Sequence, residues 1–209
     1  MILCVFEIKE GKIPSIQIKN NFSFQPNEYV KSSKGDYVEL YLTKPDYELF
    51  VEHYHIYNPV YNGGWKFKSN VGNFDKYINR WMERKIKAGE EGNAPLRTIS
   101  KLMLNSAYGK LGSSPKGKKK KPVLDDEIVR FEEMDEDERE PLYVPAAAFI
   151  TAYGRRRTIT TSQVIRDYTL KKYGEDRYYY SDTDSIHLEG TELPTELDIH
   201  PTNLGAWDH

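Results

Sequence analysis

Two aspartates lie two residues apart near the carboxyl end of the chain, in the segment Tyr-Ser-Asp-Thr-Asp-Ser at residues 180–185. An aromatic run precedes this segment and an alternating apolar and polar run follows it, which predicts a β-hairpin with the polar residues at its tip. In extended chain, residues i and i+2 point to the same side, so Asp182 and Asp184 are expected to present their carboxylates together. Such oxygens suit two Mg²⁺ ions, or Mn²⁺, and a metal pair of this kind can drive phosphoryl transfer.

Two other interpretations of Asp-Thr-Asp stay open at this point. The residues can simply cap a surface turn, since short polar turns are common. The pattern Asp-x-Asp is also a metal motif of sugar-nucleotide transferases. Other segments of the chain have to decide between these possibilities.

Residues 97–110 predict a helix with a cationic face. Four side chains recur at i, i+4, i+8 and i+11 and therefore share this face: Arg97, Lys101, Asn105 and Tyr108. Two cations suit the phosphates of a nucleotide, and a phenol suits the vicinity of its base and sugar, although a solvated face is the simpler interpretation. The opposite face is expected to be buried and carries Ile99, Leu102, Met103 and Ala107.

A second helix is predicted just before this one. Asn73 is the expected N-cap and Gly89 the expected end. Because Asn93 and Pro95 are typical of a helix start, residues 74–111 predict a pair of antiparallel helices. One side of the first helix carries a basic stripe, formed by Lys76, Arg80, Arg84 and Lys87.

The remaining segments predict a mixture of strands and helices. Strands are expected at 1–8, 13–19 and 37–43, and helices at 46–53 and from Ala146 to Tyr173, where Gly174 follows. The lysine-rich block at 116–121 and the acid-rich stretch at 125–140 favour a solvated hairpin. Three arginines on the long helix are expected to meet water or phosphate: Arg155, Arg156 and Arg157.

Composition excludes several classes of protein. The 30 basic and 32 acidic residues give a net charge of -2, so contacts with nucleic acid have to come from local stripes. Cys4 is the single cysteine, which excludes an internal disulfide and a cysteine-based zinc site. No apolar run is long enough to span a bilayer, and a reducing, cytoplasmic setting without a membrane partner is expected.

Two separate motifs, in the same order and at about the same spacing, resemble those of family B DNA polymerases. They are Lys101-Leu-Met-Leu-Asn105-Ser106-Ala-Tyr108-Gly109 and, about seventy residues later, Tyr180-Ser-Asp182-Thr-Asp184-Ser185. The similarity is greater still to the protein-primed branch found in bacteriophages, which would act in the host cell. Three further segments resemble that branch, at 9–19, 27–33 and 149–155.

The resemblance implies an α+β fold. It corresponds to a partial palm, an antiparallel sheet with the carboxylate hairpin packed on helices, with helical fingers and β-rich inserts. Residues 1–21 would be palm strands, 22–67 a first terminal-protein region, 68–112 the fingers, 113–145 a second terminal-protein hairpin, and 146–209 the palm helix and carboxylate hairpin.

The resemblance also implies roles for individual residues. Asp182 and Asp184 would be catalytic and would bind the metal ions. Nucleotide-binding roles fall on Arg97, Lys101, Asn105, Tyr108 and Lys85, with Lys87 as a competitor of Lys85. DNA-binding roles fall on Gly109, Tyr180, Thr183, Lys118 and Lys119, although Gly109 can equally end its helix. The expected partners are template and primer DNA, deoxynucleoside triphosphates and a terminal protein that primes synthesis.

Some motifs of the family are not found in this sequence. These are the first carboxylate motif, Asp-x-x-Ser-Leu-Tyr-Pro, and the Lys-x-Tyr element and basic thumb that follow the palm. The chain is therefore expected to need a complementary polymerase segment for activity. The alternative is a module that binds DNA or the priming protein without catalysis, whereas a sugar-nucleotide transferase leaves residues 101–109 unexplained.

Overall fold

The computed structural model describes residues 1–19, 21, 23–25, 28–114, 116–117, 120–125, 128–134, 137–138, 140, 142–190 and 192–208. The chain divides into two compact units. The first unit comprises residues 1–69 and 151–209, and the second comprises residues 70–150. The described residues form four helices and small antiparallel sheets, which confirms the mixed α and β character of the fold.

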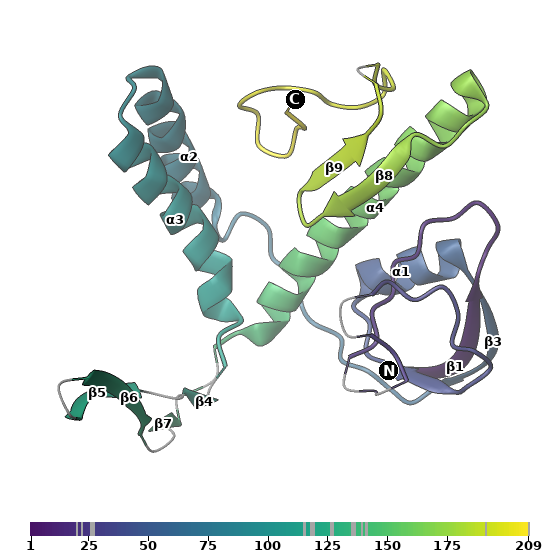
Figure 1. Cartoon of the computed structure of the whole chain (residues 1–209), viewed down its shortest axis with the longest axis horizontal. Helices are drawn as coiled ribbons and strands as arrows, with labels where there is room; N and C mark the ends of the chain where they lie inside the picture. Colours follow the sequence, from purple (N-terminus) through teal and green to yellow (C-terminus); the bar gives the residue numbers. More distant parts are fainter. Residues whose placement is uncertain are drawn as a thin grey trace. The chain divides into compact units, whose positions relative to one another are not determined.

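A three-stranded antiparallel sheet forms the core of the first unit (Figure 1). Its strand order is β2-β1-β3, with β1 at Ile2–Ile8, β2 at Val38–Leu40 and β3 at Tyr54–Tyr61. Every second residue at the start of β1 is buried, as expected for a strand with one face in a core. Helix α1, Lys44–His53, supplies Phe50 to this core, where its ring meets Phe6 edge-on at 5.3 Å. The predicted strand at 1–8 is therefore confirmed.

Two predictions for the first unit need correction at their boundaries. The strand predicted at 37–43 is reduced to Val38–Leu40, because only these residues pair with β1. The helix predicted at 46–53 begins at Lys44, because the Thr43 hydroxyl accepts a hydrogen bond from the Asp46 N–H and so caps the helix two residues earlier.

The strand predicted at 13–19 is wrong. The segment is largely buried and forms a single isolated bridge among the described residues, Gln17↔Tyr29, while side chains accept several of its backbone N–H groups. The N–H of Ile13 donates to Gln163 Oε1 at 2.9 Å, and the N–H of Ser15 donates to Tyr54 Oη at 2.8 Å. An apolar, alternating segment can thus be buried without joining a sheet, provided that its polar backbone groups find other partners.

Tyr54→Phe is expected to lower the free energy of unfolding by about 3 kcal/mol, because a buried hydroxyl with several backbone partners is lost. Besides the N–H of Ser15, this hydroxyl accepts the N–H of Ile16 at 3.3 Å and donates to the Val30 carbonyl at 2.9 Å. Urea denaturation provides the measurement. The matched control is Tyr57→Phe on the same strand, whose side chain is exposed; equal losses for the two variants would contradict this explanation.

Helix α4, Val144–Tyr173, continues into the first unit from residue 151 and is followed by Gly174 at φ +74°, as predicted. Of the three arginines expected to meet water or phosphate, Arg157 is exposed, whereas Arg155 and Arg156 are partly exposed and are paired with acids. Arg155 Nε donates to Asp46 Oδ1 at 2.9 Å, and Arg156 forms an ion pair with Glu48. Both acids belong to α1, so these pairs fasten α1 to α4.

The second unit is built on the predicted pair of helices, α2 at Asp75–Glu90 and α3 at Ala94–Leu111 (Figure 1). Asn93 caps α3 as predicted, since its side chain accepts the N–H of Leu96 at 3.1 Å. Asn73 does not cap α2, because its side-chain oxygen accepts a hydrogen bond from Asn70 instead. Gly89 lies inside α2 rather than ending it.

The buried face predicted for α3 is wrong at two positions. Ile99 and Leu102 are 51% and 61% exposed, whereas Ser100 is fully buried. Ala88 is the buried residue of α2, so the buried position of each helix carries a small side chain. The helical period correctly indicates an amphipathic helix but does not identify which residues meet the neighbour.

A hairpin of short strands follows α3, as predicted. Strand β4, Lys116–Gly117, pairs with β7, Asp137–Glu138, and β5, Lys120–Asp125, pairs with β6, Ile128–Glu133. In the second pair, two lysines stand directly opposite acids, in the registers Lys120↔Glu133 and Lys121↔Glu132. Opposite charges at facing positions stabilise such a ribbon.

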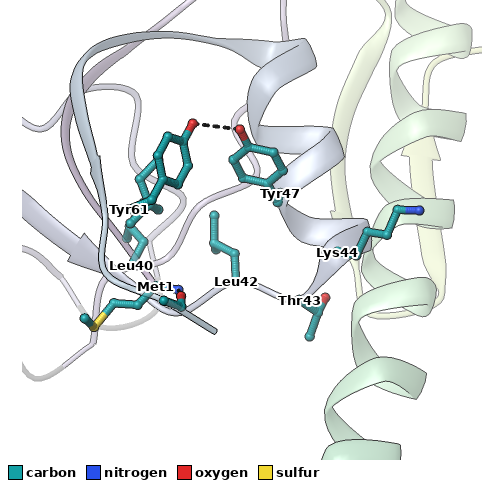
Figure 2. A pocket seen from close by; sticks show the side chains of 9 residues that line it. Met1, Leu40, Leu42, Thr43, Lys44, Tyr47 and Tyr61 are labelled. Carbon is teal, nitrogen blue, oxygen red and sulfur yellow. Dashed lines mark hydrogen bonds between the residues drawn. The ribbon is translucent and has the colours of Figure 1, made fainter. Parts of the chain in front are cut away.

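A pocket of about 270 Å³ opens beside α1 in the first unit (Figure 2). Figure 2 shows the hydroxyls of Tyr47 and Tyr61 meeting there, 2.9 Å apart. Its lining contains no carboxylate, so it is separate from the predicted metal ligands.

None of the helices in the described part of the chain combines the length and apolar character that crossing a bilayer requires.

Candidate functional site

The carboxylate hairpin is confirmed as an antiparallel pair, β8 at Tyr178–Asp182 and β9 at Ser185–Leu188. Asp182 stands opposite Ser185, which leaves Thr183 and Asp184 as the turn. The prediction that both aspartates lie in extended chain is therefore wrong for Asp184. Its direction is set by the turn, in which Thr183 has φ +50°, rather than by strand alternation.

One face of the hairpin carries polar and aromatic groups. The register places Tyr180 and Asp182 on this face of β8, opposite His187 and Ser185 of β9. The rings of Tyr180 and His187 are stacked, with centroids 4.2 Å apart and planes 10° apart. Both of these rings and Asp182 are exposed, so a flat aromatic surface lies on the same side of the ribbon as one carboxylate. No sequence motif indicated a role for His187.

Both carboxylates of the hairpin tip are exposed, and neither has a basic partner within the described part of the chain. Asp182 Oδ1 accepts only the neighbouring Thr183 hydroxyl, at 3.1 Å. Two carboxylates without competing cations fit the ligand preference of Mg²⁺ and Mn²⁺. Among the described residues, no three acidic, histidine or cysteine side chains lie close enough together to bind one metal ion. Further ligands would therefore have to join the two aspartates.

The negative charge of Asp182 affects the pKa of a tyrosine outside the hairpin. Burial raises the pKa of Tyr29, Arg155 lowers it, and the negative charges of Asp46 and Asp182 raise it further. Tyr29 also packs, with Tyr178 of β8, against the small apolar cluster around Leu49. Tyr29 belongs to the segment 27–33, one of those that resemble the phage branch, and contributes a phenol near the carboxylate hairpin.

The predicted cationic face of α3 is exposed in the second unit. It carries Arg97, Lys101, Asn105 and Tyr108, as expected from their spacing. Helix α3 has no Asp or Glu, and Lys101 has no carboxylate partner among the described residues. Its charge is therefore available to an anionic ligand, and no described side chain competes for it.

The two candidate lysines of α2 differ in their surroundings. Lys87 Nζ lies 3.8 Å from Glu91 Oε1, in an exposed pair one turn apart. Lys85 is half-buried and has no carboxylate partner in the described ranges. These contacts favour Lys85 as the lysine available to a phosphate.

Gly109 lies inside α3, and the helix is capped by Gly112, so the prediction that Gly109 ends the helix is wrong. A Cβ added at Gly109 would meet nothing within 4 Å, which leaves its surface open to close approach by another chain. Lys118 and Lys119, predicted to bind DNA, lie outside the described residues.

The carboxylate hairpin and the cationic helix, on which the resemblance to family B DNA polymerases rested, are thus both present in the structure. The sequence pattern of the family described as DNA polymerase type B, organellar and viral, matches residues 2–200, and the chain belongs to this family. The resemblance to the phage branch is confirmed by curated relatives. The DNA polymerase of Bacillus phage Nf is 45% identical over 207 residues, that of Bacillus phage phi29 43% over 211, and that of Streptococcus phage Cp-1 36% over 210.

These matches cover 98–100% of this chain but 34% of each relative, so the chain spans about a third of their length. Among solved structures, phi29 DNA polymerase complexed with primer-template DNA and incoming nucleotide superimposes with a TM-score of 0.87. That match has 41% sequence identity and covers 99% of this chain and 34% of the polymerase. The binary complex with primer-template DNA gives a TM-score of 0.82.

Proposed function

We propose that this chain is part of a protein-primed DNA polymerase, and that it adds deoxynucleotides to a primer when a further segment or chain completes it. The observation that carries the proposal is the pair of exposed carboxylates, without basic partners among the described residues, at the tip of the β8–β9 hairpin. The similarity to a polymerase solved with DNA and nucleotide supports it.

The regions of the chain take the roles that this family suggests. Palm functions fall on residues 1–21 and 146–209, and the fingers on 68–112. Residues 22–67 and 113–145 are the two regions that would contact a terminal protein and DNA. The opposed lysines and acids of β5 and β6 fit a ribbon that stays solvated while it touches a partner.

In the proposed reaction, a hydroxyl of the primer or of the priming protein attacks the α-phosphate of the nucleotide. A new P–O bond forms as the bond to pyrophosphate breaks. Asp182 and Asp184, with a carboxylate from another segment, would hold two Mg²⁺ ions, which supply charge neutralisation to this transfer.

Other residues bind and orient the reactants. Lys101, Arg97 and Lys85 neutralise the triphosphate, because their cations lie on exposed or partly exposed helix faces. Asn105 and Tyr108 shape the pocket for base and sugar. The residues assigned to the DNA strands are Gly109, Tyr180, Thr183, Lys118 and Lys119.

Primer extension tests the proposal directly. The chain is assayed with Mg²⁺, template-primer and nucleotides, alone and mixed with a polypeptide that carries the Asp-x-x-Ser-Leu-Tyr-Pro motif. Incorporation by the mixture but by neither component is the expected result. DNA or terminal-protein binding without incorporation in any mixture would instead support the non-catalytic binding module.

Lys85→Ala is expected to raise the KM for the incoming nucleotide about tenfold in the active mixture, because a single charge-assisted contact with phosphate is lost. Lys87→Ala is the matched control and should change KM little, since Lys87 is already paired with Glu91. Steady-state incorporation at varied nucleotide concentration measures both. A larger effect at Lys87 would reverse the assignment.

A further inference from the structure

A buried threonine of α4 contacts the turn between the two aspartates. The Thr158 hydroxyl donates to the Thr183 carbonyl at 2.7 Å, and the Thr158 side chain is largely buried. Its oxygen is also 3.2 Å from the Gly154 carbonyl, one turn earlier in α4. Because a hydroxyl has one hydrogen, the shorter contact with Thr183 takes the stronger bond.

This hydrogen bond acts on the peptide group that leads into Asp184. The Thr183 carbonyl and the Asp184 N–H belong to the same planar unit, so holding the carbonyl fixes the orientation of the Asp184 backbone. Thr183 itself has φ +50°, a left-handed conformation that a β-branched residue rarely adopts. Such a conformation persists where surrounding contacts enforce it, and the bond from Thr158 is one of those contacts.

A second threonine of α4 anchors the other end of the hairpin. The N–H of Arg177, just before β8, donates to Thr169 Oγ1 at 3.3 Å. Thr158 and Thr169 are eleven residues apart and so lie on the same face of α4, about 16 Å apart along its axis. Strand β8 therefore runs along this face of the helix (Figure 1), with one hydroxyl at its base and one at its tip.

We propose that Thr158 is a positioning residue for the divalent-cation ligands Asp182 and Asp184. The inference rests on the proposed function, because it assigns to Thr158 the task of presenting the metal-binding turn. Loss of its hydroxyl leaves the Thr183 carbonyl without that donor and lets the left-handed turn relax. The carboxylate of Asp184 then loses its fixed direction, and cation binding weakens.

The test compares Thr158→Val, which keeps the shape and removes the hydroxyl, with Thr158→Ser, which keeps the hydroxyl. Thr161→Val is the control, because Thr161 is also buried on α4 and forms no hydrogen bond to the hairpin among the described contacts. The wild-type chain and the three variants are compared in two measurements. The first is amide hydrogen exchange at residues 182–186 without metal. The second is paramagnetic broadening of the NMR signals of the same amides during titration with Mn²⁺.

Thr158→Val should speed exchange in the turn about tenfold and weaken Mn²⁺ binding by a similar factor, the size expected for one hydrogen bond. Thr158→Ser and Thr161→Val should resemble the wild type in both. Unchanged exchange in Thr158→Val, or equal changes in Thr161→Val, would overturn the role of Thr158. No Mn²⁺ binding by the wild-type chain would instead count against the proposed function, while the exchange data still report on the turn.

Discussion

Asp184→Ala should reduce nucleotide incorporation by the active mixture at least about a thousandfold. Metal ions at a phosphoryl-transfer site contribute several kcal/mol to stabilising the transition state, and each 1.36 kcal/mol corresponds to a factor of ten in rate. Asp184 forms part of the turn, is exposed, and has no basic partner within the described residues, so its carboxylate is available to a cation. Single-turnover incorporation with Mg²⁺ measures the effect.

A matched control separates loss of a ligand from loss of a surface charge. Glu196→Ala removes another exposed turn carboxylate of the same unit, outside the regions assigned to terminal-protein contact, and is expected to leave incorporation within about twofold, since surface substitutions have small effects. DNA binding should persist in both variants, because removing a carboxylate leaves the contacts with phosphate intact. Retention of more than a tenth of the wild-type rate by Asp184→Ala would remove this residue from the metal site.

The hairpin could be predicted from sequence because its signals are local. Aromatic and β-branched residues flank a cluster of turn residues, and neighbouring strands pair directly. The position of Asp184 within the hairpin depends on the residue at which the turn begins. A turn of two residues puts Asp184 outside the extended chain, and no pattern of residue types fixed that boundary.

The contacts that support the site are non-local and left no signal in the sequence. Thr158 reaches Thr183 across 25 residues, and Arg155 reaches Asp46 across 109. A threonine or an arginine in a helix looks the same whether it meets solvent or a distant segment. The false strand at 13–19 has the same origin, because Tyr54 and Gln163 accept N–H groups that a sheet would otherwise have used.

Lys101→Ala is expected to lower kcat/KM for the incoming nucleotide about a hundredfold in the active mixture. A cation that meets charge developing on the transferred phosphate stabilises the transition state by more than it stabilises the bound nucleotide, so the loss should appear largely in kcat. Lys101 suits this role because it is exposed on a helix that contains no acid. Steady-state incorporation at varied nucleotide concentration separates kcat from KM.

The second lysine of α3 provides the control for this prediction. Lys110 follows Lys101 by nine residues, two and a half turns, and so lies on the opposite side of the same helix. Lys110→Ala removes an equal charge and should change kcat/KM less than about threefold. The expected loss is small because Lys110 only stabilises the carboxyl end of the helix, where a cation in the last turn interacts favourably with the helix dipole. Equal losses in the two variants would mean that α3 attracts nucleic acid through its overall charge, and the salt dependence of DNA binding would then fall equally for both. A loss confined to Lys101 places the phosphate contact on the face shared with Arg97, Asn105 and Tyr108, since only that face changes.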